Sequence, residues 1–374
     1  MGDTVARLQG DEFAILIEDI ANETAVSEVV EQVHAVIGAP LALDDREVSV
    51  QCSIGIAVAH STAGTGTATR VDELLRDADI AMYQAKAAHG NGDRYFKPAM
   101  HEAVVEQLAL RAELKAAVAA EELTLAYQPI FELRTGEISG YEALLRWEHP
   151  QRGTIPPTTF IPVAEDSGLI IPLGRWVLNR ACEDAVAFQQ ADPDEQERFV
   201  SVNISARQLQ RVEIVGEVRD ALHSSGLDPS RLLLEITESV MIDDVDLAIE
   251  RLDGLRELGV RVAVDDFGTG HSSLSYIRRL PIDILKIDKR FIDSVDADDK
   301  DGKLTAAIIG LARLLDLVCV AEGVERPAQH ERLKELGCDY AQGFLLARPM
   351  TAAALNDLLG VDTVGRRMKA AAAS

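Results

Sequence analysis

Apolar and polar positions follow different patterns near the N-terminus and in the rest of the chain. Near the N-terminus, residues 7–16 predict a hairpin because a Gly and two acids separate two apolar runs, and residues 48–58 alternate as a strand does. Residues 22–37 and 71–88 place apolar side chains at helical spacing. Together these patterns predict a small α+β unit over residues 1–97.

A helix-prone segment rich in Ala and Glu, residues 98–120, is predicted to link this unit to a longer second part. Over residues 121–362, short β-rich runs alternate with segments of helical periodicity. The runs are LTLAYQPI, ISGYEALLRW, FVSVNIS, LLLEIT, RVAVDDF, DILKID, LVCVAEG and DYAQGF. Strands separated by helices predict a parallel sheet, and about eight of them over roughly 250 residues is the size of a (β/α)8 barrel. The predicted fold class is α/β, a TIM-like barrel after a partial α+β domain, with residues 363–374 as a C-terminal tail.

The charge of the chain limits the class of partner that it can bind. Lys and Arg number 37 against 62 Asp and Glu, which gives a formal net charge of −25. Such a field repels polyanions, so duplex nucleic acid is not expected as a partner. The chain has no uncharged apolar run of about 20 residues and no secretory signal, so we expect no membrane span and a cytoplasmic location.

Cysteine and histidine usage narrows the kind of metal that the chain can bind. The four cysteines are scattered without a CxxC pair, and the eight histidines show no HxxxH or HxH spacing. We therefore expect neither a disulfide framework nor a zinc site. Any metal bound here should be a hard cation with oxygen ligands.

Polar residues close most of the strand-like runs. In a (β/α)8 barrel the catalytic groups stand at the carboxyl ends of the strands. The residues at or near those ends are Glu142, Asn203, Glu235, Asp265, Asp266, Lys286, Glu322 and Gln342. A single acid after a strand is usually a helix cap or a solvated loop residue. Repeated around one rim, such acids would repel one another unless cations compensate, so the pattern predicts bound divalent metals.

The residue types at this rim favour Mg²⁺ or Mn²⁺, because carboxylate and amide oxygens suit these ions. One backbone turn can direct the adjacent Asp265 and Asp266 at two ions, the arrangement used for phosphodiester displacement. From the residues alone, Lys286 is either a group that holds water or phosphate oxygens or a solvated charge. Arg146 shares a strand face with Glu142 and is likewise either a phosphate contact or part of a salt bridge.

A series of motifs in the second part carries a resemblance to a known family. The motifs are YQPI (127–130), YEALLRW (141–147), FIPVAEDSGLI (160–170), SVNIS (201–205), LEITES (234–239), DDFGTG (265–270), KIDK (286–289), AEGVE (321–325) and QGF (342–344). With these motifs in this order, residues 108–360 resemble the EAL-domain family of cyclic di-GMP phosphodiesterases.

The resemblance implies that two Mg²⁺ or Mn²⁺ ions assist the hydrolysis of one phosphodiester bond of cyclic di-GMP to linear pGpG. The metal ligands that it implies are Glu142, Asn203, Glu235 and Asp265 for one ion, and Asp265, Asp266 and Glu322 for the other. The catalytic residues that it implies are Lys286 beside the attacking water, Glu322, and Glu238, which orders the loop after Asp266. From the residues alone, Glu238 is equally a helix-start acid. The implied substrate contacts are Gln128, Leu144, Arg146, Glu325 and Gln342.

The N-terminal unit resembles the later half of a GGDEF domain. The resemblance rests on ARLQGDEFAIL, SIGIA and DADIAMYQAKAAHGNGDRY. Gln9 stands where the first Gly of the motif lets the backbone approach the nucleotide phosphates. The first strand of the family, with its metal-binding Asp, has no counterpart in the sequence. We therefore expect no diguanylate cyclase activity.

The residues and the resemblance allow three functions. The leading one is a metal-dependent cyclic di-GMP phosphodiesterase, because the set of acids, amides and lysine is complete. The alternative is a non-catalytic cyclic di-GMP receptor that signals by a conformational change, and a more remote one is a scaffold that binds partners. The family also implies a homodimer formed through the barrel.

Overall fold

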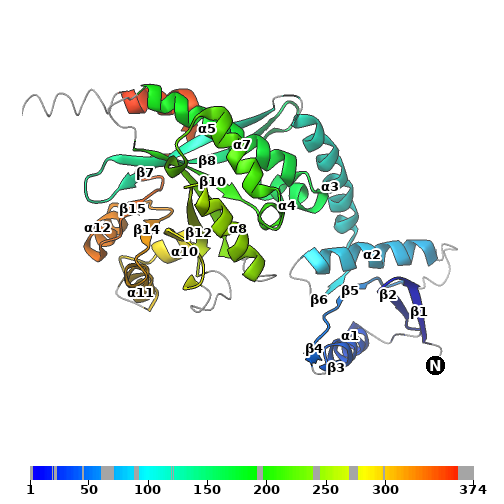
Figure 1. Cartoon of the computed structure of the whole chain (residues 1–374). Coiled ribbons are helices and arrows are strands. Elements are labelled where there is room, and N and C mark those ends of the chain that lie inside the picture. Colours follow the sequence, from blue (N-terminus) through cyan, green and yellow to red (C-terminus); the bar gives the residue numbers. More distant parts are fainter. Residues whose placement is uncertain are drawn as a thin grey trace, which may run out of the picture. The chain divides into compact units, whose positions relative to one another are not determined.

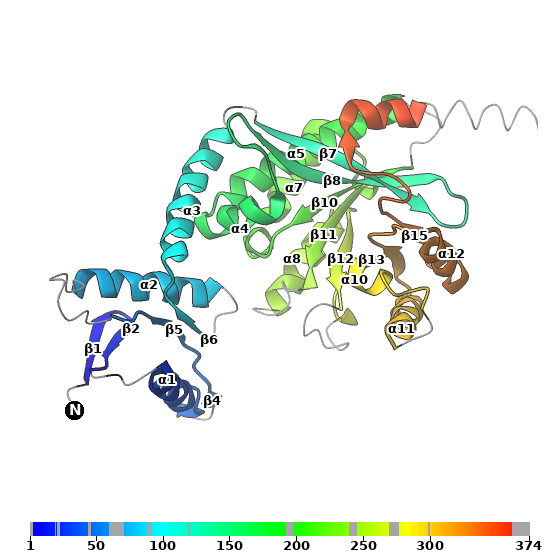
Figure 2. The ribbon, with the colours of Figure 1, turned by 180° about the vertical axis from the view of Figure 1, so that it is seen from behind.

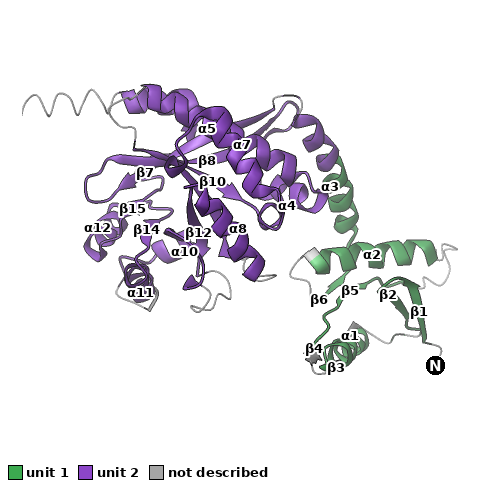
Figure 3. Ribbon diagram, viewed as in Figure 1, with its two compact units in different colours: residues 1–109 green, residues 110–374 purple. Residues whose placement is uncertain are grey.

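The structure, a computed structural model, divides into two compact units, residues 1–109 (unit 1) and 110–374 (unit 2) (Figure 3). It describes residues 3–18, 20, 23–43, 46–59, 71–87, 92–118, 120, 122–191, 197–238, 245–268, 277–297 and 300–360. The predicted tail, residues 363–374, lies outside the described residues. Among the helices described, none is long and apolar enough to cross a lipid bilayer.

Unit 1 contains three separate two-stranded sheets in its described residues. The hairpins β1 (Thr4–Gln9) with β2 (Glu12–Leu16) and β3 (Leu41–Leu43) with β4 (Arg46–Val48) are antiparallel, whereas β5 (Ser53–Ile56) and β6 (Gly92–Tyr95) run parallel. The helices are α1 (Glu23–Ile37) and α2 (Val71–Ala87). The predicted hairpin and both predicted helices are confirmed. The strand predicted over residues 48–58 is shorter, because Val48 ends the hairpin strand β4 and only Ser53–Ile56 pair with β6.

The core of unit 1 is small. Val26 and Val30 of α1 are buried with Ile56 of β5, and Ile54 and Tyr95 pack against them. On the other side of β5, Gly55 lies directly against the backbone of α2. A Cβ atom at this position would collide with the carbonyl of Ala78 and the backbone of Met82, so only glycine permits this approach.

Unit 2 is a closed barrel of eight strands, as predicted (Figure 1). The strands are β7 (Leu123–Glu132), β8 (Ile138–His149), β10 (Phe199–Ile204), β11 (Leu232–Thr237), β12 (Arg261–Phe267), β13 (Ile284–Ile287), β14 (Val318–Ala321) and β15 (Tyr340–Ala341). They pair in the order β7-β15-β14-β13-β12-β11-β10-β8, and the pairing of β7 with β8 closes the ring. The short strands β9 (Gly153–Ile155) and β16 (Met350–Thr351) pair with β8 and β7.

One strand departs from the predicted parallel sheet. β7 runs antiparallel to both of its barrel neighbours, β8 and β15. The cause is the connection between β7 and β8, which contains only residues 133–137. Parallel neighbours need a crossover of a dozen or more residues, whereas a short turn with Gly136 at φ +75° makes a hairpin.

Helices cover the outside of the barrel (Figure 2). They are the end of α3 (Pro98–Ala117), then α4 (Pro157–Ser167), α5 (Ile170–Ala191), α6 (Ala206–Leu209), α7 (Ile214–Ser225), η1 (Pro229–Arg231), α8 (Val245–Glu257), α10 (Lys289–Ile292), α11 (Lys300–Leu314) and α12 (Pro327–Leu336). Outward side chains such as Val200, Leu234 and Val262 are buried in the main core cluster. The strand period of two therefore directs the alternate side chains into the barrel.

The interior of the barrel consists of two layers of opposite character. The lower layer is apolar: the antiparallel strand β7 contributes Ile130, and the amino ends of the parallel strands contribute Phe199, Leu233, Ala263, Ile284 and Val320. Two residues further along the same strands, the inward positions become polar: Leu233 is followed by Glu235, and Ile284 by Lys286. An apolar floor therefore lies under a polar layer at the carboxyl ends of the strands.

Candidate active site

The buried ammonium group of Lys286, on β13, is the centre of the polar layer. Its Nζ lies 2.7 Å from Glu235 of β11 and 2.5 Å from Glu322, which follows β14. The carboxylates of Asp265 on β12 and Glu142 on β8 lie 3.5 Å and 3.8 Å from it. Lys286 is only 1% exposed. Four carboxylates from four neighbouring elements thus share one buried positive charge.

Two amides hold the carboxylate of Glu142. Asn203 donates from Nδ2 to Oε1 at 2.8 Å, and Gln342, which follows β15, donates from Nε2 to Oε2 at 2.7 Å. Gln128 lies opposite Glu142 in the β7–β8 pairing, and its Nε2 donates to the carbonyl of Ala347 at 3.1 Å. The amides therefore fix the orientation of Glu142 while leaving it negatively charged.

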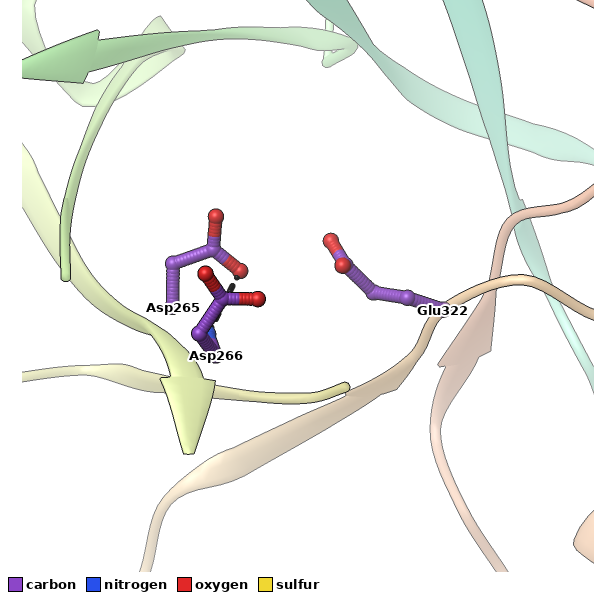
Figure 4. Close-up of side chains that lie close together, drawn as sticks. All are labelled: Asp265, Asp266 and Glu322. Carbon is purple, nitrogen blue, oxygen red and sulfur yellow. Dashed lines mark hydrogen bonds between the residues drawn. The ribbon is translucent and has the colours of Figure 1, made fainter. Parts of the chain in front are cut away.

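Asp265 and Asp266 would point to opposite faces of a regular strand. In the structure, Asp266 has a φ of +55°, a left-handed conformation that is uncommon for a residue other than glycine. The backbone turn brings both carboxylates toward Glu322 (Figure 4). The ligand atoms of these three residues all lie within 4.8 Å of one another. Backbone strain of this kind is characteristic of functional sites.

The carboxyl groups of the layer differ in their affinity for protons. Burial would raise the pKa of Glu142, but the charge of Lys286 and the hydrogen bonds from Gln342 and Asn203 lower it below its usual value. Burial raises the pKa of Glu235 well above normal, and it raises the pKa of Glu322 to about 8. Burial acts against the charge of Lys286, but the surrounding carboxylates raise its pKa well above its usual value. Lys286 is therefore cationic, and the layer carries more potential negative charge than one lysine balances.

Asp288 is a further member of this group, one that the sequence pattern did not indicate. Burial and the neighbouring Asp265 raise the pKa of Asp266 to about 6, and a hydrogen bond with Asp288 adds to this effect. Asp288 caps α10 by accepting from the backbone N–H of Arg290 at 2.8 Å. A helix cap explains an Asp at this position, so its second contact with Asp266 had no separate signal in the sequence.

Glu238, Leu144 and Arg146 are further residues of the predicted site. Glu238 accepts a hydrogen bond from the backbone N–H of Gly268 at 3.0 Å, at the start of the loop after Asp266. Leu144 and Arg146 alternate inward on β8 beyond Glu142, and burial lowers the pKa of Arg146.

Glu325 lies outside the network of carboxylates around Lys286. Its side chain is 44% exposed, and its Oε2 lies 3.3 Å from Lys289 Nζ. The structure therefore places Glu325 at an ion pair between the loop after β14 and helix α10.

Fold and site together define the class: a TIM-like barrel with carboxylates and a buried lysine at the carboxyl ends of its strands. The sequence pattern of the EAL domain matches residues 111–349, and that of the diguanylate cyclase GGDEF domain matches residues 1–92. The chain belongs to the EAL domain family, with a partial GGDEF domain before the barrel.

Similar proteins support this assignment. From Pseudomonas aeruginosa, the bifunctional diguanylate cyclase/cyclic di-GMP phosphodiesterase MucR is 44% identical over 94% of this chain and 50% of its own length. The cyclic di-GMP phosphodiesterase NbdA of the same organism is 40% identical over 96% of this chain and 45% of its own length. The solved structure of the PaMucR phosphodiesterase in complex with c-di-GMP has a TM-score of 0.63 and 45% identity, and it covers 66% of this chain and 99% of that one. The chain spans about half the length of the curated relatives that it matches.

Proposed function

We propose that this chain is a metal-dependent phosphodiesterase that hydrolyses one phosphodiester bond of cyclic di-GMP and releases linear pGpG. The observation that carries the proposal is the polar layer, in which Lys286 is surrounded by Glu142, Glu235, Asp265 and Glu322. The names of the two relatives and the c-di-GMP complex of PaMucR support the choice of substrate.

The donor set fits two hard divalent cations, Mg²⁺ or Mn²⁺. Glu235 Oε1 is buried without a hydrogen-bond partner among the described residues, so it is free to bind a cation. The cluster of Asp265, Asp266 and Glu322 offers only oxygen ligands, which these ions prefer. In the proposal, Glu142, Asn203, Glu235 and Asp265 hold one ion, and Asp265, Asp266 and Glu322 hold the other.

When bound, the two cations supply Lewis-acid stabilisation of the charge that develops on the phosphoryl oxygens. Lys286 remains protonated, because its pKa is raised, and in the proposal it donates a hydrogen bond to the attacking water or to a phosphate oxygen. Asn203 and Gln342 keep Glu142 in one orientation through their hydrogen bonds. Glu238 orders the backbone at Gly268, where the loop after Asp266 begins.

The substrate would lie across the inward face of β8 and the adjoining strand ends. Arg146 is proposed to bind a phosphate, because a guanidinium group matches phosphate oxygens with two parallel hydrogen bonds. Gln128, Leu144, Glu325 and Gln342 are the other proposed substrate contacts. Homodimerisation through the barrel remains a prediction.

The test is incubation of the purified chain with cyclic di-GMP and Mg²⁺, followed by chromatographic separation of the products. We expect pGpG from the wild-type chain with Mg²⁺, and none with Ca²⁺ or from Glu142→Ala. Glu148→Ala is a matched control, because Glu148 lies on the same strand but is exposed. Binding of cyclic di-GMP without product would favour a receptor, and absence of both binding and product would contradict both functions.

A further inference from the structure

The loop after β14 begins at Glu322 and is held against helix α10. Helix α10 follows shortly after Lys286 of β13, the neighbouring strand. Gln329 is buried and donates from Nε2 to the carbonyl of Ile292 at 3.1 Å, while its Oε1 accepts from the backbone N–H groups of Glu325 and Arg326 at 2.9 Å and 2.8 Å. These contacts form a clamp between the two chain segments that supply Glu322 and Lys286 to the polar layer.

A second set of contacts reinforces the clamp. The guanidinium group of Arg326 donates to the carboxylate of Asp296 at 2.8 Å and 2.9 Å, and to the carbonyl of Asp293 at 2.6 Å. Asp293 caps the end of α10, and Asp296 lies beyond it. The loop is thus held at several points beyond Glu322.

Lys289 is the clamp residue whose side chain contacts the residue after Glu322. Its Nζ lies 2.6 Å from Asp293 and 3.3 Å from Glu325. Its hydrocarbon stem lies directly over Gly323, the residue after Glu322. A Cβ atom on Gly323 would come within 2.5 to 2.8 Å of Cβ, Cγ and Cδ of Lys289, and Gly323 has a φ of +67°. Two parts of one side chain therefore make two different contacts, the stem with Gly323 and the ammonium group with Glu325.

We propose that Lys289 is a positioning residue of this site, with a separate task for each part of its side chain. The hydrocarbon stem packs against Gly323 and so orients Glu322 toward Asp265 and Asp266. The ammonium group pairs with Glu325 and holds it in place for the substrate. The role given to Glu325 rests on the proposed function. The role given to Glu322 rests on the geometry of the loop alone. Residues that support metal ligands in this way commonly change metal affinity or activity by about 10- to 100-fold when they are replaced.

Three substitutions separate the two tasks. Lys289→Met keeps an unbranched stem over Gly323 but removes the charge, Lys289→Ala removes both, and Lys289→Arg keeps both. Lys334→Met on α12 is the matched control, because Lys334 is an exposed lysine. Three quantities are measured for each chain: Mn²⁺ affinity without nucleotide, by electron paramagnetic resonance, and kcat and KM for cyclic di-GMP.

We expect Lys289→Ala to weaken Mn²⁺ binding about tenfold and to lower kcat. Lys289→Met should retain the Mn²⁺ affinity and kcat of the wild type but raise KM, and Lys289→Arg should resemble the wild type in all three quantities. Equal Mn²⁺ affinity in Lys289→Ala and in Lys334→Met would overturn the role of the stem. An unchanged KM in Lys289→Met would overturn the role of the charge. A wild-type chain that binds Mn²⁺ without releasing pGpG would contradict the proposed function, and the Mn²⁺ comparison would still decide the role of the stem.

Discussion

The sheets of unit 1 and unit 2 differ in how far they close. In unit 2 the sheet closes on itself, and the described strands of the ring have neighbours on both sides. In unit 1 the described strands form three isolated pairs. Most of the large apolar side chains that are strongly exposed also belong to unit 1, including Val5 (69%), Phe13 (63%) and Val36 (76%).

The difference shows what is needed to bury charge. Unit 2 holds Lys286, Glu235 and Glu142 at 1%, 1% and 6% exposure because a closed ring of strands and a layer of helices fix their positions. A buried charge costs several kcal/mol unless its partners are held in good geometry. Unit 1 has a core of a few residues and could not offset such a cost, and its described residues bury no charged side chain.

The largest expected effect comes from removing the central charge of unit 2. Above about pH 8, where Glu322 is ionised, Lys286→Met leaves buried carboxylate charge without its cation, so we expect a loss of about 3–5 kcal/mol of stability without metal and complete loss of turnover. Calorimetry with and without Mg²⁺ checks this, and Mg²⁺ should restore part of the lost stability. An unchanged melting temperature in EDTA would show that the carboxylates are already neutral.

A substitution in unit 1 should leave the barrel intact. In Gly55→Ala the new methyl group collides with the backbone of α2, so we expect unit 1 to lose about 1–3 kcal/mol of stability. Hydrogen exchange followed by mass spectrometry on the whole chain should show faster exchange in β5 and α2 and no change in the barrel strands. If exchange also rises in β11 to β13, the two units do not unfold independently.

The pH dependence of stability should belong to unit 2. The pKa of Glu322 is raised to about 8 and that of Asp266 to about 6, whereas unfolded carboxyl groups titrate near pH 4. The folded chain binds more protons between these values, so the metal-free barrel should lose several kcal/mol of stability as pH rises from about 5 through about 8, since each unit of pKa shift corresponds to about 1.4 kcal/mol. With saturating Mg²⁺ the carboxylates are compensated, and the slope should disappear. A metal-free barrel that gains stability over this range would contradict these protonation states.

The smallest effect is expected at the exposed face of the first hairpin. Phe13 is 63% exposed, so Phe13→Ser should change the free energy of unfolding by less than about 0.5 kcal/mol. Thermal melting of the two chains at equal concentration checks this. A loss of several degrees would mean that another surface covers the hairpin in solution, and unit 1 would then resemble unit 2 more closely than its described contacts indicate.

Residues at strand ends explain why much of the barrel could be predicted. The runs that end in Asn203, Glu235 and Lys286 are rich in apolar residues and separated by helical segments, so the side chains that face inward follow from the strand period. The antiparallel β7 was missed, although a connection of residues 133–137 is too short for a crossover helix. That error came from applying the pattern of the other strands to the first one.

Contacts between distant loops could not be predicted in the same way. Lys289 and Glu325 are separated by helix α11 and strand β14, and an exposed lysine and an exposed glutamate have no pattern that pairs them. The left-handed φ of Asp266 has no signal in the hydrophobic pattern of its strand. Sequence therefore indicated which residues reach the carboxyl ends of the strands, and only the three-dimensional structure shows which of them touch.

The apolar floor of the barrel has a kinetic consequence. Ile130, Phe199 and Leu233 are 1–2% exposed and, with their neighbours, fill the interior below the polar layer, so no path leads through the barrel. A ligand that enters at the carboxyl ends of the strands must leave by the same mouth. Under the proposed function, the departing product and the next substrate therefore use the same opening of the barrel. Linear dinucleotide that accumulates should then act as a competitive inhibitor.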